Sequence, residues 1–316
     1  MAYLIGTDEA GYGPNLGPLA IGISVWRVDE PIESIDLYDR LAGFVASRPT
    51  VNQIAIADSK LLYKPGGGLT LLERAVLPSL RNLGHEVETW REVLQALMVR
   101  DDGQWLKLPW YRDFDLPLPV SLSGTDLEIA TDQMRDGLAE TGVKLCQLQT
   151  RVVFPPGFND EVDQCGSKGQ VLSLATLELV SEQLRQIDEP VLVICDKHGG
   201  RNKYGPLLQT LNPDRLVEVR KESRMESIYR WGKQDARVEI RFIAKGESWL
   251  PSALSSMAAK YVRELAMMAF NRFWCRQVPD LRPTAGYPVD ARRFKDEIAA
   301  VQEKLGIGDR ELWRSR

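Results

Sequence analysis

The sequence is poor in the residues that build disulfide frameworks and zinc sites. Its 316 residues include four cysteines, at positions 146, 165, 195 and 275, and two histidines, His85 and His198. The cysteines are scattered and form no Cys-x-x-Cys pair, which argues against a structural zinc site. We expect free, buried thiols in a reducing compartment, and therefore a cytoplasmic protein.

Long apolar runs are also missing. No stretch of about 18 apolar residues occurs, so no membrane span is expected. The first apolar run ends at Asp8 and Glu9, too early for a signal peptide. The net charge of −4 argues against a surface that binds nucleic acid throughout, but is compatible with a local basic face. The length allows one large domain with an insertion, or two domains.

Glycine and proline are concentrated directly after the first acidic residues. The run 3–8 leads into Asp8-Glu9, and glycines 11, 13 and 17 and prolines 14 and 18 follow at once. Adjacent carboxylates repel each other, and ordering glycine costs more entropy than ordering any other residue, so this stretch indicates a functional site. The runs 3–8 and 19–28 predict two strands around it.

Predicted strands and helices alternate along the rest of the chain, which indicates an α/β fold. We expect strands at 87–93, 143–154, 191–195, 216–220 and 238–244, and helices within 31–49, from Thr70 to a stop at Gly84, and over 126–141, 171–187, 252–273 and 292–305. Thr70 to Glu73 has a capping-box pattern, and Pro78 should kink or split its helix. The segment Pro155–Asn159 should interrupt the chain.

We divide the chain into a catalytic domain over residues 1–250 and a C-terminal helical region, 251–316, packed on it. Residues 85–135 are interpreted as an insertion. Its aromatic and proline-rich part, 104–120, should have a packing core of its own. Trp105, Trp110, Tyr111 and Phe114 fit such a core better than a platform for stacking bases.

Carboxylates follow two of the predicted strands, Asp8 and Glu9 after the first and Asp196 after residues 191–195. In open α/β sheets ligands bind at the carboxyl ends of strands. A cluster of carboxylates suits Mg²⁺, and two such ions can clamp a phosphodiester. Alternatively, each acid only caps a turn or ends a strand. A dinucleotide site at Gly11–Gly17 is disfavoured, because Pro14 and Pro18 prevent the helix that it requires.

Several segments in order resemble the type 2 ribonuclease H family, which comprises ribonuclease HII and its relative HIII. They are Gly6-Thr7-Asp8-Glu9-Ala10-Gly11-Tyr12-Gly13 with Gly17-Pro18, Asp58-Ser59-Lys60-Leu61, Asp196, Lys245-Gly246-Glu247-Ser248, Ala253 to Glu264, and Thr284-Ala285-Gly286-Tyr287-Pro288. The resemblance spans residues 6–288 and leaves out 85–135, so the chain resembles a divergent member with an insertion.

This resemblance implies a ribonuclease H-like fold, with a mixed central β-sheet flanked by helices. It also implies an endonuclease that cleaves RNA in RNA–DNA hybrids, or at ribonucleotides embedded in DNA, with Mg²⁺ or Mn²⁺. The implied metal ligands and catalytic residues are Asp8, Glu9, Asp196 and Glu247. The implied substrate-binding residues are Gly11, Tyr12, Gly13, Lys60, Ser256, Lys260 and Tyr287. The expected partner is nucleic acid rather than a membrane, and a monomer is favoured.

Two positions depart from the family pattern. Tyr12 replaces a basic residue, and Glu247 replaces an aspartate. These departures leave open a catalytically weakened nucleic-acid-binding homologue, or a nuclease for another structured DNA. The segment 215–245 carries nine Lys/Arg against five Asp/Glu, and either tracks phosphates or forms a solvated face. His198 follows Asp196 closely and is either catalytic or, as such histidines more often are, structural.

Overall fold

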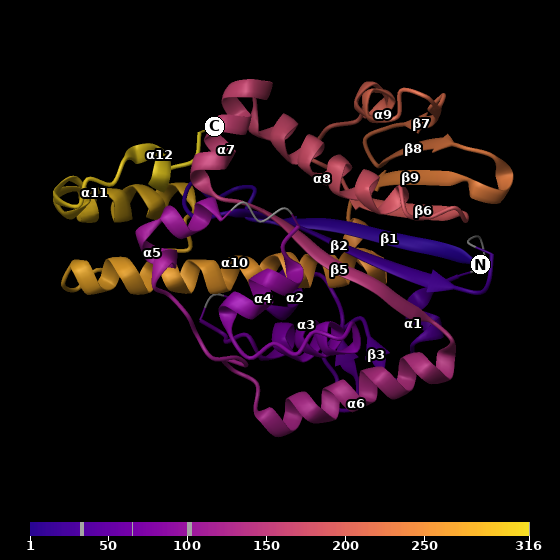
Figure 1. The fold of residues 1–316 in the computed structure, drawn as a ribbon, viewed down its shortest axis with the longest axis horizontal. Helices are drawn as coiled ribbons and strands as arrows, with labels where there is room; N and C mark the ends of the chain where they lie inside the picture. The colour runs from indigo at the N-terminus through magenta and orange to yellow at the C-terminus, as the bar shows by residue number, and fades with distance from the viewer. Residues whose placement is uncertain (32–34, 65, 100–102, 316) are drawn as a thin grey trace.

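The computed structural model describes residues 1–31, 35–64, 66–99 and 103–315. A seven-stranded sheet with the order β5-β2-β1-β6-β9-β8-β7 forms its centre (Figure 1). The strands are β1 (Ala2–Ala10), β2 (Leu19–Val28), β5 (Lys144–Val153), β6 (Val191–Asp196), β7 (Glu218–Glu222), β8 (Glu226–Trp231) and β9 (Val238–Ile243). β6 pairs parallel with β1 and β9, and the other neighbours are antiparallel. The predicted α/β class, with a mixed central sheet flanked by helices, is confirmed.

Helix α10 (Leu250–Gln277) packs on one face of β1 and β2. Two strand glycines allow the close approach: a Cβ on Gly22 would lie 2.1 Å from the Ser255 carbonyl oxygen, and one on Gly6 would lie 2.1 Å from the carbonyl carbon of Pro251. The Ser24 hydroxyl donates to the Pro251 carbonyl at 2.8 Å. The predicted helix 252–273 is therefore confirmed and is central to the fold, whereas the domain boundary at residue 250 stays a prediction.

The opposite face of the sheet is covered by α7 (Pro155–Cys165), α8 (Lys168–Leu184) and α9 (Gly205–Leu211) (Figure 1). Because strand side chains alternate between faces, Ile5 and Val193 pack with α8 residues such as Leu172, whereas Leu4 packs in the α10 core. The predicted helix 171–187 and the buried strand 191–195 are confirmed. The predicted break at Pro155–Asn159 is wrong, because prolines are well suited to the first turn of a helix.

The segment after β2 contains α1 (Leu37–Arg40), β3 (Val45–Ala46), β4 (Ile54–Ala55) and α2 (Ser59–Leu62). A longer helix within 31–49 is wrong for the described residues, since the backbone of Val45 pairs in parallel with Ile54 instead. Residues 32–34 of that predicted range lie outside the described chain.

Helix α3 (Thr70–Asn82) confirms the helix expected before Gly84, whose φ is +85°. Pro78 lies inside this helix and does not split it. The expected capping box at Thr70 is wrong, because the buried Glu73 carboxylate instead accepts hydrogen bonds from three backbone N–H groups of residues 120–122. Glu73 therefore ties the proposed insertion to the rest of the fold.

The proposed insertion contains α4 (Trp90–Leu97), the 3-10 helix η2 (Gln104–Lys107), α5 (Pro109–Arg112) and α6 (Gly124–Thr141). A strand at 87–93 is wrong, because Thr89 and Glu92 form a reciprocal capping box that starts α4. The predicted helix 126–141 is confirmed. Residues 100–102 lie outside the described chain.

The four aromatic residues of the 104–120 part, Trp105, Trp110, Tyr111 and Phe114, are buried, as expected of core residues. A separate packing core is nevertheless wrong, because they belong to the same core as α10. The ring centroids of Trp110 and Phe270 are 5.2 Å apart in an edge-on arrangement. The insertion is thus continuous with the central packing of the molecule.

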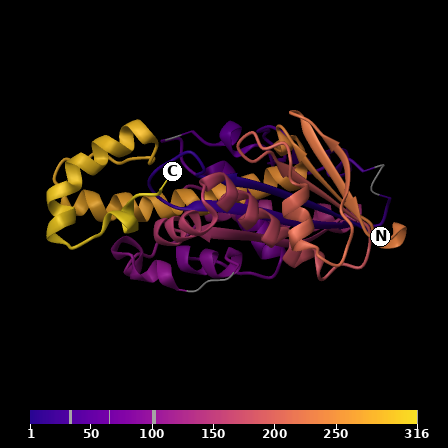
Figure 2. The ribbon, with the colours of Figure 1, turned by 90° about the horizontal axis from the view of Figure 1, so that it is seen from above.

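The C-terminal part of the chain adds α11 (Pro288–Lys304) and α12 (Asp309–Leu312), and the 3-10 helices η3 (Gln234–Ala236) and η4 (Gly246–Ser248) precede α10. Figure 2 shows α11 and α12 at one end of the molecule and β7 to β9 at the other. The predicted strands at 143–154, 216–220 and 238–244 and the closing helix 292–305 are confirmed, whereas β8, α9 and α12 were not predicted. Within the described ranges, no helix is long and apolar enough to cross a membrane.

Candidate active site at the carboxyl ends of β1 and β6

Asp196 is the last residue of β6, and Asp8 lies two residues before the end of the neighbouring parallel strand β1. The register pairs Thr7 of β1 with Cys195 of β6, so the next residue on each strand is an aspartate. Parallel neighbours are about 4.8 Å apart, which brings the two acids to the same edge of the sheet. Asp8 is buried and Asp196 is half-buried. Sequence reasoning placed Asp196 correctly at a strand end, but it ended the first strand too early, because Asp8 and Glu9 lie within β1, which stays paired with β2 as far as Ala10.

Burial makes the negative charge at this edge unfavourable. The pKa of Asp8 is raised from 3.8 to about 7. Desolvation is the largest cause, a hydrogen bond from Ser256 opposes the rise, and repulsion by Asp196 adds to it. The pKa of Glu9 is also raised well above its ordinary value, first by desolvation and then by repulsion from Asp8 and Asp196. The three carboxylates therefore act on one another as a single electrostatic cluster.

Glu247 is brought to this cluster by direct contact between η4 and β6. The Asp196 carboxylate accepts hydrogen bonds from the backbone N–H groups of Lys245, at 3.1 Å, and Gly246, at 3.2 Å. A Cβ on Gly246 would lie only 3.0 Å from the Asp196 nitrogen, so glycine permits this approach. Burial raises the pKa of Glu247, and repulsion from Asp196 and Asp58 adds to the rise.

Lys60 and Ser256 join the cluster from α2 and α10. The hydroxyls of Ser59 and Ser256 are 2.9 Å apart, which fixes α2 against α10. Burial lowers the pKa of Lys60, but Asp58, Asp8, Glu247 and Asp196 together raise it above its ordinary value. Lys60 is thus a cation that balances part of the cluster's negative charge.

Lys260 is engaged elsewhere. Its ammonium group forms an ion pair with Glu264, with Nζ and Oε1 2.5 Å apart, and lies 4.5 Å from the ring centroid of Tyr63. Burial lowers the pKa of Lys260, although Glu264 opposes this effect. A contact between Lys260 and substrate stays a prediction, and the described contacts give this lysine a role in holding α2 against α10.

The glycine-rich loop after β1 is bordered by α10 and by the segment before α11. Gly11 has a φ of +90°, and a Cβ there would lie 2.5 Å from Arg263 Nε, so packing within the chain already requires glycine. Gly13 is exposed, and a Cβ there would meet the ring of Tyr287 at 3.7 Å. Tyr287 is itself 56% exposed. The structure therefore brings Gly13 and Tyr287 together on the surface.

The side chain of Tyr12 points toward α8 and the loop after β6. Lys168 Nζ lies 4.7 Å from the centroid of its ring. A Cβ on Gly199 would lie 3.0 Å from its hydroxyl oxygen. Burial raises the pKa of Tyr12, with a further contribution from Glu9 and an opposing one from Arg201. A lysine from another element thus lies near the position where the family pattern has a basic residue.

His198 is buried and is built into the core. Its Nδ1 lies 3.1 Å from the Ser173 hydroxyl, and its ring packs edge-on against Tyr204 and Phe242. Burial, with a smaller contribution from Arg201, lowers the pKa of His198 to about 3. These contacts favour the structural interpretation over a catalytic one.

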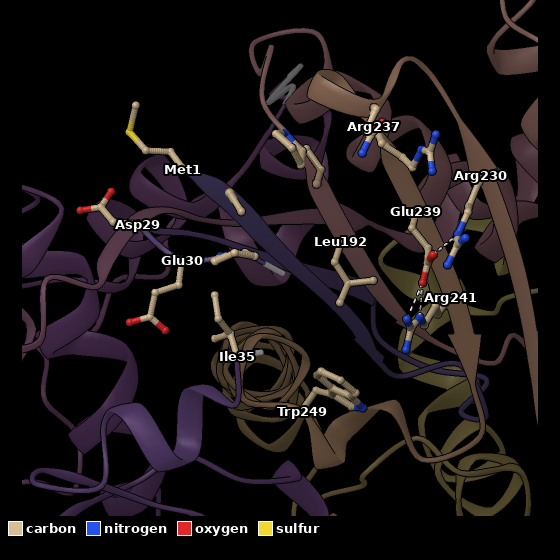
Figure 3. A pocket seen from close by; sticks show the side chains of 15 residues that line it. Met1, Asp29, Glu30, Ile35, Leu192, Arg230, Arg237, Glu239, Arg241 and Trp249 are labelled. Carbon is tan, nitrogen blue, oxygen red and sulfur yellow. Dashed lines mark hydrogen bonds and ion pairs between the residues drawn. The ribbon is translucent and has the colours of Figure 1, made fainter. Parts of the chain in front are cut away.

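The basic segment 215–245 is partly neutralised, since Arg230 and Arg241 both pair with Glu239. These residues, with Arg237 and Trp249, line a hollow of about 520 Å³ (Figure 3). The hollow lies at the amino ends of β1 and β6. Six residues of strand, about 20 Å, separate it from the acids. It is therefore not part of the acidic site.

The acidic site offers the donor chemistry of a hard cation. Carboxylates are the ligands that Mg²⁺ and Mn²⁺ favour, and a divalent ion would offset the buried negative charge, since burial first and repulsion by Asp196 second raise the pKa of Asp8. As their side chains are placed, however, the described residues include no group of three or more His, Cys, Asp or Glu close enough to hold a metal ion. The residues fit such an ion by chemical type and location, and their side chains would have to converge to bind it.

Comparisons with known proteins found similarity to solved structures of ribonucleases H at low identity. No family model and no curated protein matches the chain. It is similar to the ribonuclease H2 of Pyrococcus horikoshii OT3, with 16% identity and a TM-score of 0.44, over 98% of this chain and 92% of that one. It is similar to the RNase HII of Archaeoglobus fulgidus in complex with PCNA, with 15% identity and a TM-score of 0.42, over 99% and 94%. Bst-RNase HIII in complex with Mn²⁺ matches with 15% identity and a TM-score of 0.44, over 99% and 66%. At this level of identity and overlap, function has to be inferred from the residues of the site.

Three basic residues next to the glycine-rich loop had no assigned role in the sequence. Arg263 is buried and donates from Nη2 to the carbonyl of Ala285 at 3.0 Å. Arg314 is buried and donates to the carbonyls of Gly11 and Pro14. Lys168 lies over Tyr12. Arg263 falls within a segment that resembles the family, whereas nothing in the local pattern singles out Lys168 or Arg314.

Proposed function

We propose that this chain is a metal-dependent endoribonuclease of the type 2 ribonuclease H kind, which cleaves RNA in RNA–DNA hybrids or at ribonucleotides embedded in DNA. One observation carries the proposal: Asp8, near the carboxyl end of β1, and Asp196, the last residue of β6, lie on neighbouring parallel strands, with Glu9, Glu247 and Lys60 within electrostatic reach. The ordered family-like segments support it. Mg²⁺ or Mn²⁺ is the cofactor that this oxygen-rich site would take.

In this proposal Asp8, Glu9, Asp196 and Glu247 would hold the cation at this edge of the sheet. A bound divalent ion supplies a water of lowered pKa and charge stabilisation at the leaving oxygen. Ser256 keeps the Asp8 carboxylate oriented through its hydrogen bond. Lys60, charged at neutral pH, faces the negative charge of the substrate phosphate. Gly13 and Tyr287 offer an open backbone and an exposed ring where a nucleotide sugar or base could pack.

The test uses three labelled duplexes: an RNA–DNA hybrid, a DNA duplex with one embedded ribonucleotide, and an all-DNA duplex. Each is incubated with Mg²⁺ or Mn²⁺ and the wild-type chain, Asp8→Asn, or the control Asp188→Asn, which changes an exposed carboxylate. We expect cleavage of at least one ribonucleotide-containing duplex, loss of at least 100-fold in Asp8→Asn, and no change in the control. Cleavage of the all-DNA duplex alone would reassign the substrate. Cleavage unaffected by Asp8→Asn would refute the proposed site.

A second candidate is a nucleic-acid-binding homologue with weakened catalysis. It is favoured by Glu247, whose side chain is one methylene longer than that of the family's aspartate, because catalytic geometry tolerates shifts of about 1 Å poorly. Glu247→Asp separates the two candidates. Hybrid binding without turnover in the wild-type chain, with turnover gained in Glu247→Asp, would support the weakened homologue.

A further inference from the structure

A small hollow of about 170 Å³ opens beside the glycine-rich loop, and no residue of the acidic cluster lines it. Tyr12, Gly13 and Asn15 of the loop form one wall, and Phe158, Lys168 and Arg314 form the others. Residues near the C-terminus reach it because they lie beside α7 (Figure 1), where Asn159 Nδ2 donates to the Trp313 carbonyl at 2.9 Å. None of the described residues that line the hollow is acidic.

Arg314 is a buried cation with donors to spare. It is 1% exposed, and its Nη2 donates to the carbonyls of Gly11 and Pro14. Its Nε and Nη1 have no hydrogen-bond partner among the described atoms, and no described carboxylate pairs with it. The ring of Phe158 lies 4.8 Å from its guanidinium carbon. Burying a charge without a counter-ion is costly, so an anion that reached this guanidinium would be bound favourably.

Lys168 supplies a second cation from another direction. It is the first residue of α8, a helix of 17 residues whose N-cap is Ser167. The amino end of a helix carries a partial positive charge and unpaired N–H groups, which favour anions. Lys168 Nζ lies over the Tyr12 ring, and no ion pair of Lys168 occurs among the described residues. The two cations, each against an aromatic ring, therefore border the same small space.

We propose that this hollow binds a phosphate group, held by Arg314 and Lys168 between the rings of Phe158 and Tyr12. Its volume is below the roughly 300–1,000 Å³ of sites for whole small-molecule ligands, which suits one phosphate rather than a complete nucleotide. The planar guanidinium of Arg314 has two nitrogens, Nε and Nη1, without hydrogen-bond partners among the described atoms, and such a pair of donors suits the oxygens of a phosphate. The phosphate can belong to a nucleic-acid strand or be free in solution. That a nucleic-acid strand supplies the phosphate rests on the proposed function, whereas the existence of a phosphate site does not.

The experiment compares Lys168→Gln with the control Lys144→Gln, which removes the same charge from an exposed residue at the far end of β5. Binding of a labelled RNA–DNA hybrid is measured by fluorescence anisotropy in Ca²⁺, without turnover, at 50 to 200 mM salt. In a second arm, the thermal midpoint is measured with inorganic phosphate, and with chloride at equal ionic strength.

If the phosphate belongs to a strand, Lys168→Gln loses one phosphate contact. The affinity of Lys168→Gln for the hybrid at 0.1 M salt is then about 5- to 10-fold lower than that of the wild type. The ratio of the two affinities shrinks about 3.5-fold between 50 and 200 mM salt, because the slope of log affinity against log salt concentration is smaller by about 0.9 in the variant. If the phosphate is free, hybrid affinity is unchanged but Lys168→Gln loses the rise in thermal midpoint that phosphate gives the wild type. Either result supports the site. Equal behaviour of Lys168→Gln and Lys144→Gln in both arms overturns it.

Arg314→Lys provides a second variant that retains the charge but not the fork of N–H donors. Because Arg314 also holds the loop carbonyls, its fold is checked first by circular dichroism. A folded Arg314→Lys should lose the phosphate effect in whichever arm the wild type shows it. The binding arms require no cleavage, so a chain that binds phosphate here but cleaves no duplex would retain this site and refute the proposed function alone.

Discussion

Replacing Asp8 by asparagine should stabilise the metal-free protein while abolishing its activity. Asp8 is 6% exposed, and burial raises its pKa from 3.8 to about 7. Each pKa unit corresponds to about 1.36 kcal/mol. At pH 8 the folded chain therefore bears a cost of about 4 kcal/mol for ionising Asp8. Asparagine has nearly the same shape and its carbonyl can still accept the Ser256 hydrogen bond, so it should remove this cost.

The stability that Asp8→Asn gains over the wild type should increase with pH. The folded chain keeps the Asp8 proton up to about pH 7, whereas the unfolded chain releases it near pH 4. The unfolded state thus binds fewer protons between these values, and wild-type stability falls as pH rises through this window. The advantage of Asp8→Asn should be about 4 kcal/mol at pH 8 and only about 1.5 kcal/mol at pH 5.

Urea unfolding in EDTA, followed by circular dichroism at pH 5 and pH 8, measures both values. Asp188→Asn serves as the control for losing a negative charge, and its effect should stay within about 0.5 kcal/mol at either pH. Wild-type unfolding is repeated with Mg²⁺, which should recover part of the stability that Asp8→Asn gains. An Asp8→Asn chain no more stable than wild type at pH 8 in EDTA would show that Asp8 is not held as a desolvated charge.

Three further predictions concern the scaffold. Gly22→Ala should lower the free energy of unfolding in urea by about 3 kcal/mol, because its Cβ would overlap the Ser255 carbonyl. The control Gly157→Ala, which lies in open space on α7, should be neutral or stabilising by up to about 1 kcal/mol. Equal effects of the two substitutions would contradict this account of α10 packing. The His198 ring signals in NMR should not titrate from pH 8 to pH 5, because its pKa is lowered to about 3 by burial; a midpoint near 6.5 would place the ring in solvent. Glu73→Gln should lower the stability measured by thermal unfolding by about 2–4 kcal/mol. The Glu73 carboxylate accepts hydrogen bonds from three backbone N–H groups, and an amide would turn its own donors toward them. An unchanged thermal midpoint would show that these hydrogen bonds contribute little to stability.

The central strands could be predicted because their signal is local. Residues 191–195 form a continuous apolar run, and this run is a strand buried on both faces. The acids at the strand ends followed from the same reasoning, because parallel neighbours present their carboxyl ends together. By contrast, the helix α4 was misread as a strand although Thr89 and Glu92 carry the capping-box spacing and Trp90, Val93, Leu94 and Leu97 have helical spacing. Both helical signals were therefore present in the local sequence.

Other features depend on contacts between distant parts of the chain. The carboxylate of Glu73 bonds to a segment almost fifty residues away, so its local pattern with Thr70 predicted the wrong cap. Lys168 reaches Tyr12, and Arg314 reaches Gly11, only after α8 and the C-terminal residues have packed beside the loop. No short-range pattern encodes such pairs. The sequence therefore indicated the acids and Lys60 of the candidate site, whereas Lys168 and Arg314 emerged only from the fold.

The glycine-rich loop separates two charges of opposite sign, each incompletely neutralised by the protein. On one side, Asp8 repels Glu9 and Asp196, and Lys60 offsets only part of this charge. On the other side, Arg314 has two donor nitrogens without described partners. A nucleic-acid strand with an associated divalent cation would complement both, with the cation at the carboxylates and a phosphate at the guanidinium. Free Mg²⁺ and free phosphate should then each stabilise the chain separately, and a strand that binds at both sides should have a higher affinity than either contact alone gives, because the second contact forms within the same complex.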